Sequence, residues 1–245
     1  YTSGNFFDDH ELGPESRRAV LKELGDRCDK VIVETLSHMI RKGQVEEALK
    51  SVDRLEVAFG LESTNERVLR YGVNKMWGLK EHARAAALVR GVGGTVKTYL
   101  LVKPPFLTER EAIEDAVRSG HEADSHSDTI SFNPVNVQRD TLVDHLFRRR
   151  EYRPPWLWSV VEVLERTRDL KAHVKSHPTA GGMRRGSHNC GSCDRRVIDA
   201  IEEFSLGLRR DFSELDCACR ERWRAELDLQ DFMMTPGDIG AILAR

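Results

Sequence analysis

The sequence of 245 residues has no long apolar run. No stretch approaches the roughly 18 consecutive apolar residues that a membrane-spanning helix needs, so we expect no membrane segment. The chain does not begin with Met, and it has no basic stretch followed by an apolar one, as a secretory signal would have. Without a secretory feature, disulfides are not expected, and the sequence predicts a cytoplasmic protein.

The chain also has no large excess of one charge, with a net charge of −2, but its charges are unevenly distributed. Its 40% hydrophobic content fits a soluble domain with an adequate core. Between 139 and 196 there are 13 Lys and Arg against 7 Asp and Glu. This basic stretch is either a solvated helix face or a phosphate-binding surface, densest at 148–150 and 184–185. Composition alone does not separate the two.

Predicted helices and strands alternate along the first 150 residues. The expected strands are 30–35, 55–59, 95–102 and 128–132, and the first residues, 1–6, read as the end of another strand. Helices are expected at 14–25, 38–52, 65–71, 79–90 and 140–149, with one more after the capping box of Thr108 and Glu111. This order predicts a parallel sheet, either open or closed into a partial or full barrel. Charged residues gather where the strands end, which is where such folds carry their chemistry.

The pattern changes near Tyr152. A proline- and tryptophan-rich corner leads to an amphipathic helix that ends near Leu170, and 171–188 reads as a loop. We therefore expect a barrel-like domain at 1–151 and a small extension at 152–245.

Four of the five cysteines lie in that extension, as Cys190-x-x-Cys193 and Cys217-x-Cys219. Two close pairs can place four thiolates around one tetrahedral ion. Zinc is the first expectation, and an iron–sulfur cluster, which also takes four thiolates, is the alternative. His188 and Asp194 flank the first pair and are expected to support the ligands rather than to replace them. Cys28 stands alone as an ordinary thiol.

Several segments together resemble one family. They are TSGNFFDD (2–9), VIVET (31–35), FGLESTNERVLRYGVNK (59–75), TYLLVKPPFLTEREAI (98–113), FNPVNVQRDTLV (132–143), YRPPWLW (152–158) and GSHNCGSCD (186–194). In this order they resemble the radical SAM proteins of archaeosine biosynthesis (RaSEA, beta subunits of archaeosine synthase). More distantly, they are similar to the radical SAM domains of the Elongator catalytic subunit and of coproporphyrinogen dehydrogenases.

The resemblance implies an α/β fold, a radical-SAM-type partial (β/α)6 barrel of parallel strands with the four-cysteine extension behind it. It also implies S-adenosylmethionine bound on a [4Fe-4S] cluster. In the family a CxxxCxxC motif before the TSG segment holds that cluster, and the first cysteine of this sequence is Cys28. We therefore expect an N-terminally truncated fragment whose cluster ligands lie upstream, and which is itself inactive.

Family motifs also imply the cofactor-binding residues. Ser3 and Gly4 correspond to the turn that meets the amino group of the methionine moiety, and Glu34 to an acidic strand end. Glu62 and Lys75 match two polar positions, with the Lys75 ammonium suited to the methionine carboxylate. Asn133 and Asn136 resemble the last-strand segment along the adenine. Simpler interpretations remain for two of them, since Glu62 could cap a helix and Lys75 could be an exposed turn residue.

The implied function is radical C–N bond cleavage of a lysine adduct on 7-deazaguanine in tRNA, which forms archaeosine. Its implied partners are tRNA and a separate alpha subunit that transfers the lysine. The alternative is a non-catalytic binding module that retains the barrel and the zinc site. Lys103 is placed at the barrel mouth as a possible substrate contact, and Trp156 and Trp158 as core residues or base-stacking groups.

Overall fold

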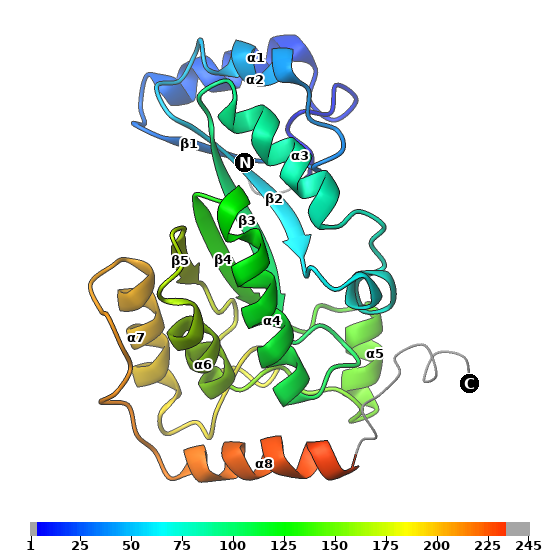
Figure 1. Cartoon of the computed structure of the whole chain (residues 1–245), viewed down its shortest axis with the longest axis vertical. Coiled ribbons are helices and arrows are strands. Elements are labelled where there is room, and N and C mark those ends of the chain that lie inside the picture. Colours follow the sequence, from blue (N-terminus) through cyan, green and yellow to red (C-terminus); the bar gives the residue numbers. More distant parts are fainter. Residues whose placement is uncertain (1–3, 234–245) are drawn as a thin grey trace.

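The fold is built on one parallel five-stranded sheet. The structure, a computed structural model, describes residues 4–233, and the strands pair in the order β1-β2-β3-β4-β5 (Figure 1). Their bounds are Val31–Glu34, Leu55–Glu62, Thr95–Val102, Thr129–Pro134 and His173–Ser176. Every neighbouring pair is parallel, so the expectation of a parallel α/β fold is confirmed.

Helices connect the strands, and several begin and end where the sequence indicates. They are α1 (Pro14–Gly25), α2 (Lys42–Ala48), α3 (Leu79–Arg90), α4 (Glu109–Ala123), α5 (Leu142–Arg148), α6 (Leu157–Thr167), α7 (Asp194–Ser205) and α8 (Cys219–Met233), with short η1 (Val68–Val73) and η2 (Asp124–His126). The capping box ahead of α4 forms as expected, since Thr108 Oγ1 accepts from the Glu111 N–H and Glu111 accepts from the Thr108 N–H. No helix among the described residues is long and apolar enough to span a membrane.

Two expectations about local structure were wrong. The segment 171–188 contains β5, which extends the sheet beyond β4, so only its remainder is loop. Four residues of strand between glycine- and histidine-rich neighbours leave too short a pattern to be recognised. The second helix is also shorter than 38–52 and covers only Lys42–Ala48. Because β5 lies after Tyr152, the sheet continues past the boundary at 151/152, and that division stays a prediction.

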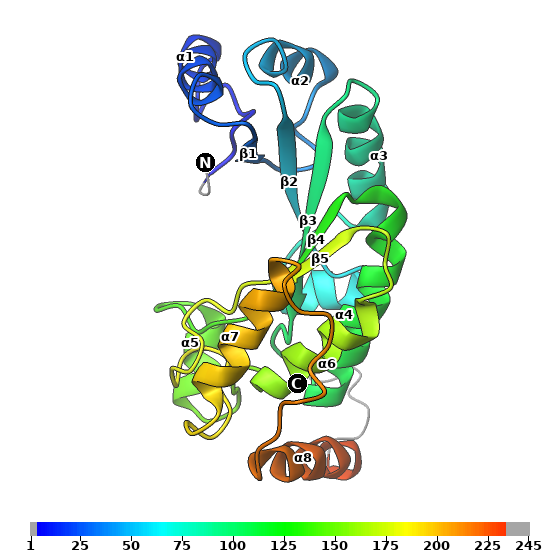
Figure 2. The ribbon, with the colours of Figure 1, turned by 90° about the vertical axis from the view of Figure 1, so that its left-hand side faces the viewer.

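The two faces of the sheet differ in polarity. Alternate residues such as Val57, Val96 and Ile130 are fully buried and face the helices, because side chains of a strand point to opposite sides in turn. Helices α3, α4 and α6 pack on this face (Figure 2). The opposite face carries polar side chains, and Ile32 on it is 37% exposed. Strand β1 is therefore buried on one face only.

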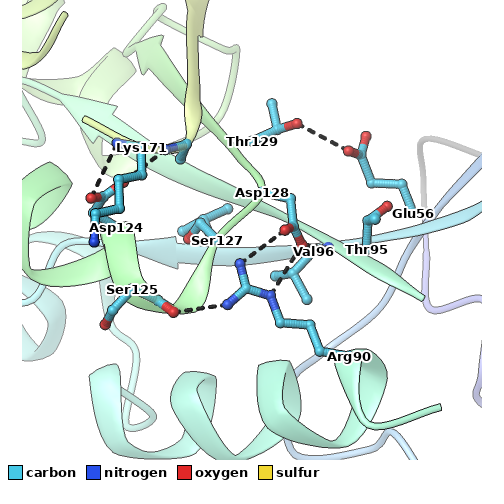
Figure 3. A network of polar contacts seen from close by, with 12 residues as sticks. Glu56, Arg90, Thr95, Val96, Asp124, Ser125, Ser127, Asp128, Thr129 and Lys171 are labelled. Atoms are coloured by element: carbon cyan, nitrogen blue, oxygen red, sulfur yellow. Dashed lines mark hydrogen bonds and ion pairs between the residues drawn. The ribbon is translucent and has the colours of Figure 1, made fainter. Parts of the chain in front are cut away.

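A polar network holds the amino-terminal ends of the strands together (Figure 3). Asp128, just before β4, accepts from the Val96 N–H of β3 and from two nitrogens of Arg90 at the end of α3. Asp124 accepts from the backbone N–H groups of Lys171 and Ala172, just before β5. These carboxylates join strand starts to helix ends, which fixes the strand register at the edge opposite the chemistry.

A buried ion pair joins the sheet to the C-terminal helices. Glu109, the first residue of α4, is fully buried and contacts Lys103, just after β3. Its Oε1 also accepts from the Trp156 N–H at 2.7 Å and the Ser159 hydroxyl at 2.6 Å, both at the start of α6. Lys103 is only 5% exposed and its ammonium contacts Glu109, so a role as a substrate contact stays a prediction.

We expect the Glu109→Gln substitution to lower the free energy of unfolding by about 3–5 kcal/mol, because it leaves the buried Lys103 ammonium without its counter-charge. Urea unfolding at neutral pH measures this. The control is Glu114→Gln, which breaks the surface pair with Arg166 and should cost about 1 kcal/mol or less. The Lys103→Met/Glu109→Gln double variant should recover most of the loss. Equal effects of Glu109→Gln and Glu114→Gln would contradict this account.

Candidate functional site

A cavity of about 1140 Å³ opens on the polar face of the sheet. We call it the strand-face cavity. Its lining residues come from all five strands, the segments that follow β4 and β5, and α7: Glu34, Glu62, Lys97, Tyr99, Leu101, Ser131, Asn133, Pro134, Val135, Asn136, Lys175, Ser176, His177, Thr179, Glu202, Ser205 and Leu206. Many of them lie at or near the carboxyl ends of parallel strands, the edge where such sheets bind ligands. It is the candidate ligand site.

Glu34 and Tyr99 form a direct contact inside this cavity. The Tyr99 hydroxyl donates to Glu34 Oε1 at 2.7 Å, across the intervening strand β2. Burial, and the hydrogen bond to Glu34, raise the pKa of Tyr99 well above its usual range. Tyr99 therefore stays protonated and holds the carboxylate in one orientation. One oxygen of Glu34 is thereby committed, and the carboxylate is presented to the cavity at a defined position.

Glu62 occupies an irregular position at the end of β2. The strand register shifts between Gly60 and Glu62, and the Glu62 φ of 73° is rare for a residue with a side chain. The Lys75 ammonium lies 3.6 Å from Glu62 Oε1 and donates to the Gly60 carbonyl. Burial raises the pKa of Glu62, although Lys75 opposes this effect. A strained backbone that carries a buried carboxylate is characteristic of a functional position.

Gly60 makes this arrangement sterically possible. A Cβ at Gly60 would lie 2.1 Å from Glu62 Oε1, so any other residue would displace the carboxylate. Lys75 follows Asn74, whose φ of 58° ends the π-helical turn η1 and directs the chain back to the strand. The two simpler interpretations, Glu62 as a helix cap and Lys75 as an exposed turn residue, do not describe this pair. The Glu62 carboxylate contacts Lys75, and Lys75 is largely buried.

The remaining expected cofactor residues are divided among three places. Asn133 and Asn136 line the strand-face cavity with Glu34 and Glu62. Gly4, with a φ of 80°, lies next to the end of β1, where the Phe6 N–H donates to the Glu34 carbonyl. Gly4 and Lys75 are not lining residues, and Ser3 lies outside the described residues. The structure thus gathers four of the seven at one cavity, and their role in cofactor binding stays a proposal.

Sequence reasoning missed several residues of the cavity wall. Lys97, Tyr99, Ser131 and Lys175 all point from the strands toward it. The sequence pattern that could have identified them is the alternation of polar residues along β3 and β4, as in Thr95, Lys97 and Tyr99. That period of two marks a polar face, and in a sheet whose other face is covered by helices, such a face is available for a ligand.

The four C-terminal cysteines converge. Their Sγ atoms all lie within 4.8 Å of one another, with separations of 3.9 Å for Cys190–Cys193, 3.7 Å for Cys190–Cys217 and 3.6 Å for Cys193–Cys219. Four sulfurs at about 2.3 Å from a central ion form a tetrahedron with edges of about 3.8 Å. No disulfide joins them. Their spacing therefore fits a single tetrahedral ion, whereas a four-iron cluster would need wider spacing, because each thiolate binds a different iron.

Surrounding donors support the thiolates. Trp158 Nε1–H lies 3.2 Å from the Cys219 sulfur, and the Asn189 amide lies 3.4 Å from the Cys193 sulfur. Burial raises the pKa of Cys190, but backbone N–H groups of Cys193 and Ser192 outweigh it and bring this pKa to about 6. Asp194 Oδ1 accepts from the N–H groups of Asn189 and Gly191, so it holds the loop and is not one of the converging group.

The basic stretch is only partly available for a ligand. Arg148 and Arg185 both contact Asp144 and hold its pKa at about 2, and Arg149 pairs with Glu151. Arg150 and Arg184 instead line a second cavity of about 530 Å³, which we call the arginine pocket. Its other lining residues are Lys103, Phe106, Leu107, Thr108, Leu146, Phe147, Glu151, Tyr152, Arg153, Glu226 and Gln230.

Hydrogen bonds join the segments that line the two cavities. The Val137 N–H donates to the Arg185 carbonyl, and Arg185 Nε donates to the Val137 carbonyl. Val137 follows Asn136 of the strand-face cavity, and Arg185 follows Arg184 of the arginine pocket. Trp156 and Trp158, considered for base stacking, are 4% and 1% exposed and belong to the core. The aromatic groups next to the arginines are Phe147 and Tyr152 instead.

Comparisons with known proteins agree with this architecture. The archaeosine synthase subunit beta of Methanosarcina acetivorans is 41% identical over 239 residues, which is 95% of this chain and 69% of that protein. Its counterpart in Thermococcus kodakarensis is 39% identical over 231 residues, 91% of this chain and 71% of that protein. A structure of Elp3 from the archaeon Methanocaldococcus infernus superposes with a TM-score of 0.56 at 17% identity, covering 80% of this chain and 46% of that one. No family model matches.

The parallel sheet, its open polar face and the likeness of its fold to that Elp3 structure define an α/β protein with a partial barrel of parallel strands. Within that class, similarity over nearly the whole chain identifies the relatives. The chain belongs to the family of archaeosine synthase beta subunits.

We expect the protein to bind one equivalent of metal at the four cysteines, and Cys193→Ser to release it and to expose α7 and α8. A closed metal site contributes folding free energy directly, so its loss should unfold the segment it joins. Metal analysis and amide hydrogen exchange measure the two effects, with β2 and α3 retaining their protection. The exposed Cys28→Ser should keep the metal. Full metal content in Cys193→Ser would refute the site.

Proposed function

We propose that this protein is the radical SAM subunit of an archaeosine synthase and modifies a 7-deazaguanine base in tRNA by C–N bond cleavage. Membership of the beta-subunit family supports the reaction, because the relatives carry that name. The structural observation that supports the proposal is the strand-face cavity. Four of the residues expected to bind the cofactor line it, from three strands and the segment after β4: Glu34, Glu62, Asn133 and Asn136.

The cavity suits S-adenosylmethionine and a substrate base together. Its volume of about 1140 Å³ exceeds the roughly 300–1,000 Å³ of a typical small-molecule site. The oriented Glu34 carboxylate can accept from hydroxyl or ammonium groups of the cofactor, and the Asn133 and Asn136 amides can pair with an adenine edge. Lys75 would reach the methionine carboxylate only by leaving Glu62, so Lys75 serves first to position Glu62.

The cluster is not held by the residues of this cavity. None of its lining residues is a cysteine, and the 245 residues contain no CxxxCxxC motif. The cluster ligands therefore have to come from outside these residues. Bound on such a cluster and supplied with one electron from it, S-adenosylmethionine would provide the radical chemistry of the reaction. This chain's residues bind and orient the cofactor, and the strand-face cavity shields the reacting atoms.

We assign zinc to the four-cysteine site, since sulfur spacing of 3.6–3.9 Å fits one tetrahedral ion. All four ligand positions are then taken by protein, which is characteristic of a structural zinc site. The domain boundary near Tyr152 fits this role, because the ion joins the starts of α7 and α8 behind α6.

The whole enzyme needs a partner, because a separate alpha subunit is proposed to attach the lysine that this subunit cleaves. tRNA is the shared substrate. The arginine pocket is the proposed tRNA contact, since Arg150 and Arg184 line it together with Phe147. Arginine can pair with phosphate while the phenyl ring meets sugar or base.

The proposed function predicts that the full-length protein, purified without oxygen and with its cluster intact, forms 5′-deoxyadenosine and archaeosine in equal amounts. The assay contains S-adenosylmethionine, a one-electron reductant such as dithionite for the cluster, free lysine, the alpha subunit and tRNA that carries the 7-deazaguanine base, and mass spectrometry quantifies both products. Glu34→Gln should weaken S-adenosylmethionine binding about tenfold, since a charge-assisted hydrogen bond contributes about 1.5–3 kcal/mol. The exposed Glu15→Gln on α1 serves as the control. A protein with an intact cluster that binds tRNA but forms neither product would be the non-catalytic module instead.

We expect Arg150→Gln and Arg184→Gln each to weaken tRNA binding and to lower the slope of log K against log salt by about 1, because each loses one phosphate contact. Arg166→Gln removes a surface arginine paired with Glu114 and should leave both quantities unchanged. Arg148→Gln should have a smaller effect than Arg150→Gln, because Arg148 is engaged by Asp144. Filter binding at several salt concentrations measures this. Equal losses for Arg166→Gln and Arg150→Gln would rule out the arginine pocket as the contact.

A further inference from the structure

Two lysines of the strand-face cavity have no acidic partner. Lys97 of β3 and Lys175 of β5 both line it. Among residues 4–233, neither ammonium forms an ion pair, and the Lys97 ammonium lies 4.8 Å from the centre of the Tyr99 ring. By contrast, Lys30, Lys75 and Lys103 each contact a carboxylate. The wall of the cavity therefore carries two ammonium groups that no carboxylate of the described residues contacts directly, although Glu34, Glu62 and Glu202 line the same cavity.

Strand register brings the two side chains to the same place. Tyr99, Ser131 and Lys175 form one row across β3, β4 and β5, and Lys97 lies two residues before Tyr99 on the same face. Neighbouring strands are about 4.8 Å apart, so two lysine side chains separated by one strand can converge above Ser131. Burial, and to a smaller extent the positive charge of Lys175, lower the pKa of Lys97. The two ammonium groups thus affect one another.

The acids closest to Lys97 already have other partners. Glu34 accepts from the Tyr99 hydroxyl at 2.7 Å. Glu56 accepts from the Thr129 hydroxyl at 3.0 Å and contacts Lys30 at 2.9 Å. Holding two like charges in a half-buried wall is unfavourable, and an anion placed between them would remove that cost.

We propose that Lys97 and Lys175 form an oxyanion subsite that binds a carboxylate or phosphate of the substrate on the floor of the strand-face cavity. The Ser131 hydroxyl donates to Asn133 Oδ1 at 2.9 Å, which leaves the Asn133 amide hydrogens as neutral donors next to the lysines. The two candidate sources of this anion follow from the proposed function, on which the proposal rests. One source is the carboxylate of the lysine group on the base, and the other is a nucleotide phosphate.

The subsite is distinct from the tRNA contact at the arginine pocket. Lys97 and Lys175 project from the sheet, whereas Arg150 and Arg184 lie on segments that follow α5 and β5. A group bound by the lysines would lie inside the cavity, near Glu34. The lysines would therefore select which modified base is accepted, and the arginines would bind any tRNA.

Isothermal titration calorimetry of the metal-loaded full-length protein, without S-adenosylmethionine, tests the subsite. The probes are Nε-acetyl-L-lysine, its methyl ester and inorganic phosphate. We expect at least one of the two anions to bind, and Lys97→Met and Lys175→Met each to weaken that binding about tenfold, the effect of losing one charge-assisted hydrogen bond. Lys80→Met, at an exposed position of α3, should bind like the wild type.

The probes distinguish the two sources. Tighter binding of Nε-acetyl-L-lysine than of its methyl ester indicates the carboxylate, and tighter binding of phosphate than of Nε-acetyl-L-lysine indicates the nucleotide. Lys97→Arg should restore binding lost in Lys97→Met, which separates loss of charge from misfolding. If neither anion binds, or if both Met variants bind as the wild type does, the subsite is refuted. Because no cofactor is present, that failure leaves the proposed radical reaction untouched.

Discussion

The Glu109 carboxylate is buried without access to water, and the C-terminal half of the molecule is organised around its charge. A carboxylate in such a place is stable only with full compensation. Lys103 supplies the opposite charge, while the Trp156 N–H and Ser159 hydroxyl supply two donors. Glu109 also lies at the start of α4 and contacts the start of α6. Two helix dipoles therefore favour its negative charge.

Further contacts extend from this pair to the last helix. The Ser159 hydroxyl oxygen accepts from Trp223 Nε1–H at 2.8 Å, and the Glu109 N–H donates to Gln230 Oε1 at 2.7 Å, both on α8. Trp156 Nε1–H donates to Glu226 of the same helix. One buried carboxylate thus links the end of β3, α4, α6 and α8. This explains why residues placed by the sequence in a separate extension pack as a continuation of the core under the sheet.

The outline of the fold was predictable from sequence because its signals are local. Helices α1 and α3 and strand β3 follow from apolar periodicity, glycine and proline positions and capping residues, and their bounds agree with the structure. The four cysteines were recognised because their spacing alone indicates a shared ion. Lys97 and Lys175 were not, since their proximity depends on the register of three strands. Strand β5 (HVKS), needed to place Lys175, has one apolar residue and lacks the β-branched run by which β1, of the same length, was recognised.

The four-cysteine site and the arginine pocket both include residues of α8. Cys219 begins this helix, and about two and three turns later Glu226 and Gln230 line the arginine pocket. Two indole N–H groups join α8 to α6. Trp158 on α6 contacts the Cys219 sulfur, and Trp156 at the start of α6 donates to Glu226. A metal ion held by the cysteines would therefore fix the helix that forms one wall of the pocket, although the ion would lie outside both cavities. Through the position of α8 it would act on the tRNA binding proposed for the arginine pocket, whereas the strand-face cavity has its own support from the sheet.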